Sequence, residues 1–107
     1  MMKDFAGLKI KDLVRKYGSP IYLYDLDSML KSVRDFKEAF GGKVEIHYAA
    51  KANAHPEILK AFKKEKIGVD TVSWGEALDC LEAGFKPEDI IFSGVAKTEQ
   101  ELKEAVK

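Results

Sequence analysis

The sequence is short of the residues and patterns that mark several protein classes. A single cysteine, Cys80, excludes a disulfide within the chain and a zinc site built from several cysteines. No apolar run approaches the roughly 18 residues of a membrane span, and no signal-peptide pattern opens the chain. Net charge is also absent, because basic and acidic residues both number 18. We therefore expect a cytoplasmic protein, with neither nucleic acid nor a membrane as partner.

The residues that are present describe a folded chain of modest size. Hydrophobic residues make up 46% and charged residues 34% of the 107 positions, which is typical of a soluble globular protein. This length is enough for one small domain and too short for two.

The first forty residues predict a helix, a strand and a second helix. Apolar residues recur at helical spacing over 8–17, and Gly18 and Pro20 end that helix. The β-branched and aromatic run at 21–24 predicts a strand. Asp27 is placed to cap the second helix, which Gly41-Gly42 ends. The apolar stripe of this second helix consists of Met29, Val33, Phe36 and Phe40.

The rest of the chain repeats one pattern three times, a strand followed by a helix. The predicted strands cover 44–49, 69–72 and 90–93. Pro56 lies in the first turn of the helix after the first strand, and capping-box patterns at 73–76 and 98–101 open the other two. Successive strand-helix units predict a parallel sheet with right-handed crossovers.

The predicted sheet is too small to be complete. Three parallel strands with helices on one side leave two open edges and one uncovered face, and a (β/α)₈ barrel needs about 250 residues. We therefore expect an α/β fold in which residues 43–107 form the first three units of a TIM-type barrel, preceded by an N-terminal segment at 1–42. The alternative is a self-contained small α/β domain whose first two helices cover the sheet.

Lys51 is the first candidate functional residue. It is predicted at the carboxyl end of the first parallel strand, where barrel enzymes place their functional side chains. Strand alternation puts Lys51, Ala49 and His47 on the inward face, and Tyr48 and Ala50 toward the helices. An amine at a barrel mouth suits imine formation with an aldehyde such as pyridoxal 5′-phosphate (PLP). By spacing alone, an ordinary surface lysine is the more frequent outcome.

Four ordered stretches resemble motifs of the fold type III PLP-dependent decarboxylases. YAAKAN at 48–53 resembles the family's cofactor-lysine motif, usually Y-A-V-K-A-N. SPIYLYD at 19–25, DTVSWGE at 70–76 and IIFSGVAKT at 90–98 resemble three further family stretches in the same order. The sequence departs from these patterns at Ala50, where the family has Val, and at Trp74, where it has Gly.

This resemblance implies a cofactor and three site residues. Lys51 would be the catalytic lysine that holds PLP as an imine, and Ala49 would lie against the cofactor ring. Asp70 would sit near that lysine, where a carboxylate favours a protonated nitrogen. For Asp70 a structural hydrogen bond inside the barrel is the competing interpretation. The resemblance also implies later barrel strands and a C-terminal β domain beyond these residues.

The remaining polar candidates have structural interpretations. Glu76 is expected to form a capping box with Ser73, and His55 to cap the helix that follows it. The two histidines have no acidic companion at ligand spacing, so no metal site is predicted. Cys80 is expected in the core.

The resemblance also implies the reaction. In the intact protein it implies PLP-dependent decarboxylation of a small amino-acid substrate, meso-diaminopimelate, to lysine and CO₂, by a homodimer. Three alternatives stay open: decarboxylation of ornithine, arginine or carboxynorspermidine; alanine racemisation; and a non-catalytic α/β binding module.

Overall fold

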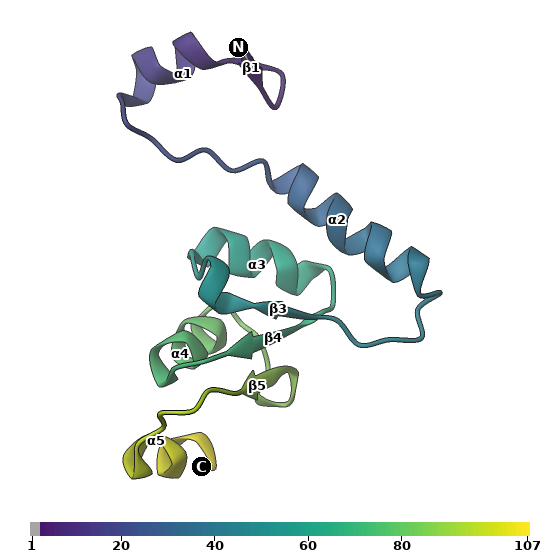
Figure 1. Cartoon of the computed structure of the whole chain (residues 1–107), viewed down its shortest axis with the longest axis vertical. Coiled ribbons are helices and arrows are strands. Elements are labelled where there is room, and N and C mark those ends of the chain that lie inside the picture. The colour runs from purple at the N-terminus through teal and green to yellow at the C-terminus, as the bar shows by residue number, and fades with distance from the viewer. Residues whose placement is uncertain (1–2) are drawn as a thin grey trace.

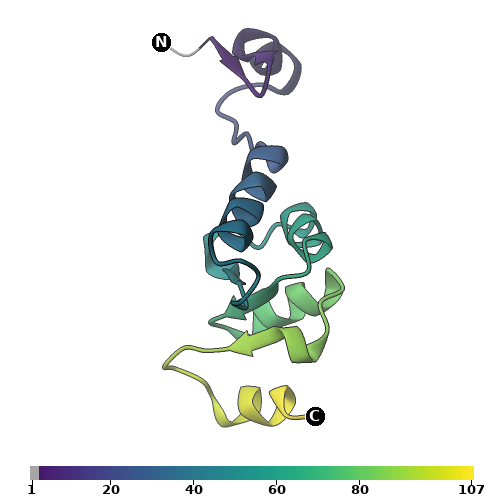
Figure 2. The ribbon, with the colours of Figure 1, turned by 90° about the vertical axis from the view of Figure 1, so that its right-hand side faces the viewer.

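A computed structural model describes residues 3–107 of the chain (Figures 1 and 2). A small N-terminal hairpin and helix stand apart from a strand-helix body, and a long helix joins the two parts. The elements in chain order are β1 (Asp4–Phe5), β2 (Leu8–Lys9), α1 (Ile10–Tyr17), α2 (Leu26–Ala39), β3 (His47–Ala49), η1 (Ala50–Ala52), α3 (Pro56–Lys64), β4 (Gly68–Thr71), α4 (Trp74–Glu82), η2 (Pro87–Asp89), β5 (Ile90–Phe92) and α5 (Glu99–Ala105).

The body is built on a three-stranded parallel sheet in the order β3-β4-β5, as the sequence predicts. Ala49 pairs with Asp70, and Asp70 pairs with Ile91, so the three strands end at the same edge. Within residues 3–107, β3 and β5 each pair only with β4, which leaves two free sheet edges. The sequential order and parallel direction confirm the start of a barrel-type α/β arrangement.

One face of this sheet carries the core. Val69 in β4 is fully buried and joins one apolar cluster with Leu59 and Phe62 of α3 and Cys80 of α4. The ring of Tyr48 lies 4.3 Å from that of Phe62, centroid to centroid. The helices therefore cover the face that Tyr48 and Val69 share, as alternation predicts.

Within residues 3–107, no helix covers the opposite face of the sheet (Figure 2). His47, Ala49 and Asp70 lie on it, because they alternate with the helix-facing residues along β3 and β4. The prediction that His47 and Ala49 share the face opposite Tyr48 is confirmed.

Two elements differ from their predicted form in the N-terminal part. The predicted strand at 21–24 is absent, and those residues are an irregular connection in which Tyr22 is 90% exposed. A strand needs a hydrogen-bonded neighbour, and this connection runs between α1 and α2, away from the sheet (Figure 1). The cap of α2 is Asp25 and not Asp27, because the Asp25 carboxylate accepts a 3.1 Å hydrogen bond from the Ser28 N–H.

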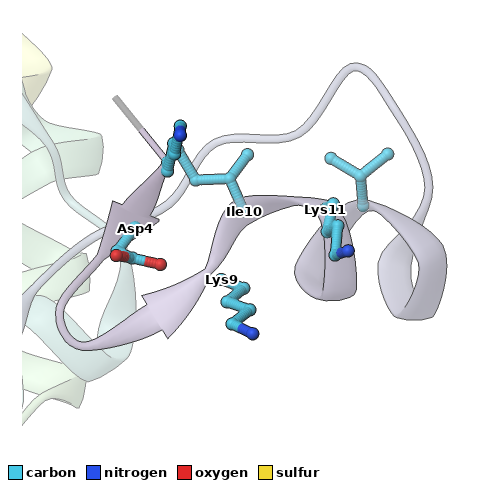
Figure 3. Close-up of a pocket in the computed structure, with 6 residues that line it drawn as sticks. Asp4, Lys9, Ile10 and Lys11 are labelled. Atoms are coloured by element: carbon cyan, nitrogen blue, oxygen red, sulfur yellow. The ribbon is translucent and has the colours of Figure 1, made fainter. Parts of the chain in front are cut away.

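The hairpin before α1 was not predicted. β1 and β2 pair antiparallel, so the helix expected over 8–17 begins at Ile10. An open pocket of about 620 Å³ lies between this hairpin and α1, and Asp4, Lys9, Ile10 and Lys11 line part of it (Figure 3). This pocket contains none of the predicted site residues.

Helix α2 packs on the body through its first half and is bonded to the end of α3. Val33 is buried in the core cluster, and Arg34 Nη2 lies 2.5 Å from the Glu65 carboxylate at the end of α3. Farther along, Phe36 and Phe40 stack on each other but stay 60% and 51% exposed. The predicted apolar stripe is therefore covered in its first half only.

None of the helices in residues 3–107 is long and apolar enough to cross a membrane.

Candidate functional site

Lys51 lies in the turn that follows the first parallel strand. The predicted strand at 44–49 begins only at His47 but ends at Ala49 as expected, and η1 (Ala50–Ala52) carries the lysine. Ala50 is fully buried, whereas Lys51 is exposed. Strand alternation therefore does not reach Lys51, and that part of the sequence argument was wrong. The predicted position of Lys51, at the carboxyl end of the sheet, is retained.

Asp70 and Ser93 form a polar pair at this same edge. Ser93 Oγ donates a 2.7 Å hydrogen bond to Asp70 Oδ1, and Ser93 N–H donates one of 2.8 Å to the carbonyl of Thr71. The backbone bond prolongs the β4–β5 ladder by one step and sets the position of the Ser93 hydroxyl. Asp70 thus makes the structural hydrogen bond that one interpretation expects. It also lies on the inward face of the sheet, where a role near the cofactor lysine would place it.

Sequence reasoning missed Ser93. The position of Ser93 in the sequence could have identified it as a candidate site residue. It directly follows β5, at the edge where the carboxyl ends of parallel strands meet.

Several hydrogen bonds hold the turn around Lys51. The Tyr48 hydroxyl donates a 2.9 Å bond to the Asn53 carbonyl, and Asn53 Oδ1 accepts a 2.9 Å bond from the His55 N–H. His55 Nδ1 in turn accepts from the Glu57 N–H at 3.3 Å, so His55 caps α3 as predicted. Lys51 sits inside a short segment whose two ends are fixed.

His47 lies at the other end of β3. Its ring stands over Gly68 on the neighbouring strand, with Nδ1 buried and without a hydrogen-bond partner. Nε2 is 3.8 Å from the carboxylate of Glu45. The contact with Gly68 supports the interpretation of His47 as packing.

The other polar candidates behave structurally. Ser73 Oγ accepts a 3.2 Å bond from the Glu76 N–H and caps α4. The Glu76 carboxylate accepts from the Val72 N–H at 2.8 Å, one residue before the expected partner. Trp74 lies on the helix side, where its ring centroid is 6.1 Å from that of Phe92.

Cys80 is a core residue, as predicted. It is fully buried, and this burial raises the pKa of its thiol to about 11. A thiol that stays protonated is neither a nucleophile nor a metal ligand at neutral pH. No group of three or more histidine, cysteine or acidic side chains in residues 3–107 is arranged to hold a metal ion.

The carboxyl edge of the sheet therefore brings together an exposed amine, a hydrogen-bonded carboxylate and a small side chain, from Lys51, Asp70 and Ala49. A primary amine is the group that condenses with an aldehyde, and a carboxylate nearby stabilises positive charge on nitrogen. The Lys51 amine and the small Ala49 side chain match what PLP requires of a protein, which is an amine for its aldehyde and space for its ring.

Comparison with known proteins agrees with this chemistry. The family model described as pyridoxal-dependent decarboxylase, pyridoxal binding domain, matches residues 26–107. A diaminopimelate decarboxylase of Mycobacterium leprae is 41% identical over 102 residues, which are 95% of this chain and 22% of the relative.

Solved structures give the same result. A crystal structure of diaminopimelate decarboxylase from Helicobacter pylori, complexed with L-lysine, superposes with a TM-score of 0.83 at 39% identity over 90% of this chain. Ornithine decarboxylase from Entamoeba histolytica reaches a TM-score of 0.80 at 28% identity, also over 90% of the chain. The chain spans 25% and 30% of these two structures.

Proposed function

Because this chain belongs to the pyridoxal-dependent decarboxylase family, we propose that Lys51 binds PLP and that the complete protein decarboxylates an amino acid. The observation that carries the proposal is the position of Lys51, exposed in the turn at the carboxyl end of β3, at the sheet edge where Asp70 lies. Residues 43–107 would be the first three units of the PLP-binding barrel.

Each of the three site residues has a role in this proposal. The Lys51 amine would hold the cofactor through its aldehyde carbon, with loss of water, and it needs its neutral form to do so. The Asp70 carboxylate, oriented by Ser93, stabilises a protonated nitrogen nearby. Ala49 leaves room for the ring, because its side chain is a single methyl group. When bound, PLP supplies the ring that accepts the electron pair released as the substrate carboxylate leaves.

We propose meso-diaminopimelate as the substrate, with lysine and CO₂ as products. The support is the 39% identity to the Helicobacter pylori diaminopimelate decarboxylase structure, against 28% to the Entamoeba histolytica ornithine decarboxylase structure, each over 90% of this chain. Ornithine, arginine and carboxynorspermidine remain the alternative substrates for decarboxylation, and racemisation of alanine is a further alternative reaction. We also propose that the complete protein is a cytoplasmic homodimer.

The test uses the complete protein that contains this segment, loaded with PLP. We expect CO₂ release from meso-diaminopimelate in preference to the other three basic amino acids, and no racemisation of alanine. Lys51→Ala should abolish the visible absorption of bound PLP and the turnover. Lys43→Ala, which changes an exposed lysine in the turn before β3, is the matched control and should keep both.

Two results would contradict the proposal. A visible band and turnover that survive in Lys51→Ala would remove Lys51 from the site. A wild-type protein that binds no PLP would favour the non-catalytic binding module.

A further inference from the structure

We propose that Tyr48 is a positioning residue for Lys51, because its hydroxyl fixes the far end of the turn that carries the lysine. The hydroxyl donates a 2.9 Å hydrogen bond to the main-chain carbonyl of Asn53, and this bond spans the turn from residue 48 to residue 53. The inference rests on the proposed role of Lys51 in binding PLP.

The Tyr48 ring is itself held in place. Its main chain belongs to β3 and pairs with Val69. Its ring lies 4.3 Å from the ring of Phe62, centroid to centroid, and Phe62 is buried in the core. A phenol fixed at both its main chain and its ring presents its hydroxyl at one position.

The short turn η1 needs a hydrogen bond from outside its own three residues to hold its shape. η1 has only three residues, and a single turn of this kind is weakly held by its own hydrogen bonds. Ala50 is fully buried and anchors the near end. At the far end, the Tyr48 hydroxyl holds the Asn53 carbonyl, while the Asn53 side chain accepts from the His55 N–H. Lys51 is the exposed residue between these two anchors.

Tyr48 acts through the turn and not on the reacting atoms. It lies on the helix-facing side of β3, opposite Ala49, and its hydroxyl hydrogen is committed to Asn53. Burial raises the pKa of Tyr48, so the hydroxyl stays protonated and able to donate. A phenylalanine at this position would keep the ring contact and remove only the donor.

The experiment compares Tyr48→Phe with two controls in the complete PLP-loaded protein. Tyr22→Phe changes a 90% exposed tyrosine outside the body, and Phe85→Leu loosens the same core cluster at a residue that does not hold the Tyr48 ring. The measurements are the pH midpoint of the visible PLP band, the rate of PLP release, and hydrogen exchange of the amides at 50–55. Thermal unfolding is followed in parallel.

We expect Tyr48→Phe to shift the pH midpoint of the band, to release PLP about tenfold faster and to exchange the turn amides faster. Phe85→Leu should lower the Tm while leaving the midpoint in place, and Tyr22→Phe should change neither. If Tyr48→Phe moves the Tm but not the midpoint or the release rate, Tyr48 is structural only and the inference is wrong.

The inference and the proposed function fail in different ways. A PLP band that persists in Lys51→Ala overturns the proposed function, and the role of Tyr48 with it. A band that is lost in Lys51→Ala but unchanged in Tyr48→Phe overturns the positioning role alone.

Discussion

The hydroxyl of Ser93 lies 2.7 Å from a carboxylate oxygen of Asp70 and donates a hydrogen bond to it. The two residues come from the ends of adjacent parallel strands, and the Ser93 backbone continues the β4–β5 ladder by bonding to Thr71. This pair holds a carboxylate at the sheet edge where Lys51 lies. A carboxylate held in one rotamer does not have to be ordered again when a ligand arrives.

Replacing Ser93 therefore tests whether the orientation of Asp70 matters for the site. Ser93→Ala should weaken PLP binding by about threefold to tenfold, the effect of losing one hydrogen bond of about 1 kcal/mol. Asp70→Ala should weaken it further, and Ser93→Ala should add little on that background. Ser32→Ala, which removes a serine hydroxyl on α2, is the control. Additive effects in a PLP titration would show that Ser93 does not act through Asp70.

Gly68 should not tolerate a side chain. A Cβ at this position would overlap the His47 ring and lie 2.8 Å from the Asp89 carbonyl oxygen. Gly68→Ala should destabilise the complete protein by about 1–3 kcal/mol in a denaturant titration. His47→Ala should restore only part of this loss, because the backbone contact with Asp89 remains.

Gly75→Ala is the matched control for Gly68. In α4, the nearest heavy atom to a Cβ at Gly75 is Ser73 Oγ at 3.9 Å, so alanine has space there. We expect a change of about 1 kcal/mol or less, toward greater stability, since alanine favours a helix over glycine. Equal destabilisation at both positions would contradict the packing of His47 on Gly68.

The ion pair between α2 and the end of α3 predicts a pH dependence. Hydrogen bonding to Arg34 lowers the pKa of the Glu65 carboxyl. A carboxyl group whose pKa is lowered by folding stabilises the folded state at pH values above the ordinary pKa of Glu. This contribution is lost as the pH falls through the lowered pKa. The Tm difference between wild type and Arg34→Gln should therefore be constant near neutral pH and shrink below about pH 4.

Arg15→Gln is the control for this measurement, because Arg15 pairs with Asp12 within one helix at 3.6 Å and both side chains are largely exposed. A Tm difference for Arg34→Gln that grows on acidification would contradict the assigned sign.

The 107-residue polypeptide should not decarboxylate meso-diaminopimelate by itself. Within residues 3–107 both sheet edges are free and the face with Asp70 has no cover, so water reaches every proposed site residue. The chain also spans about a quarter of the related enzymes. CO₂ release by the purified polypeptide above the rate of free PLP would show that this prediction is wrong.

Much of the body was predictable from the sequence, because local patterns and packing agree there. Val69 illustrates this, since it lies in a β-branched run, and its burial under α3 and α4 is what a strand-helix repeat requires. Thr98 and Glu101 form the reciprocal capping box that their spacing predicts. Lys51 was also predicted to follow the end of the first parallel strand, and it does.

The errors lie where a local pattern was the only evidence. The run at 21–24 has strand propensity, but no neighbouring strand pairs with it. Asp25 and Asp27 are equally good caps by type, and only the backbone decides that Asp25 accepts from Ser28. Lys51 was placed by alternation, which holds in β3 and stops where η1 begins. The Ser93–Asp70 and Tyr48–Asn53 bonds are not local signals, so only the fold reveals them.

The most direct test of the account is to identify the lysine that carries the cofactor. The complete protein is reduced with borohydride in the presence of PLP, and the labelled peptide is found by mass spectrometry. We predict a label on Lys51 and on none of the other 15 lysines of this segment. Lys51→Arg should give no label, because its guanidinium stays protonated. A label on a different lysine, or an unchanged yield in Lys51→Arg, would contradict the assignment.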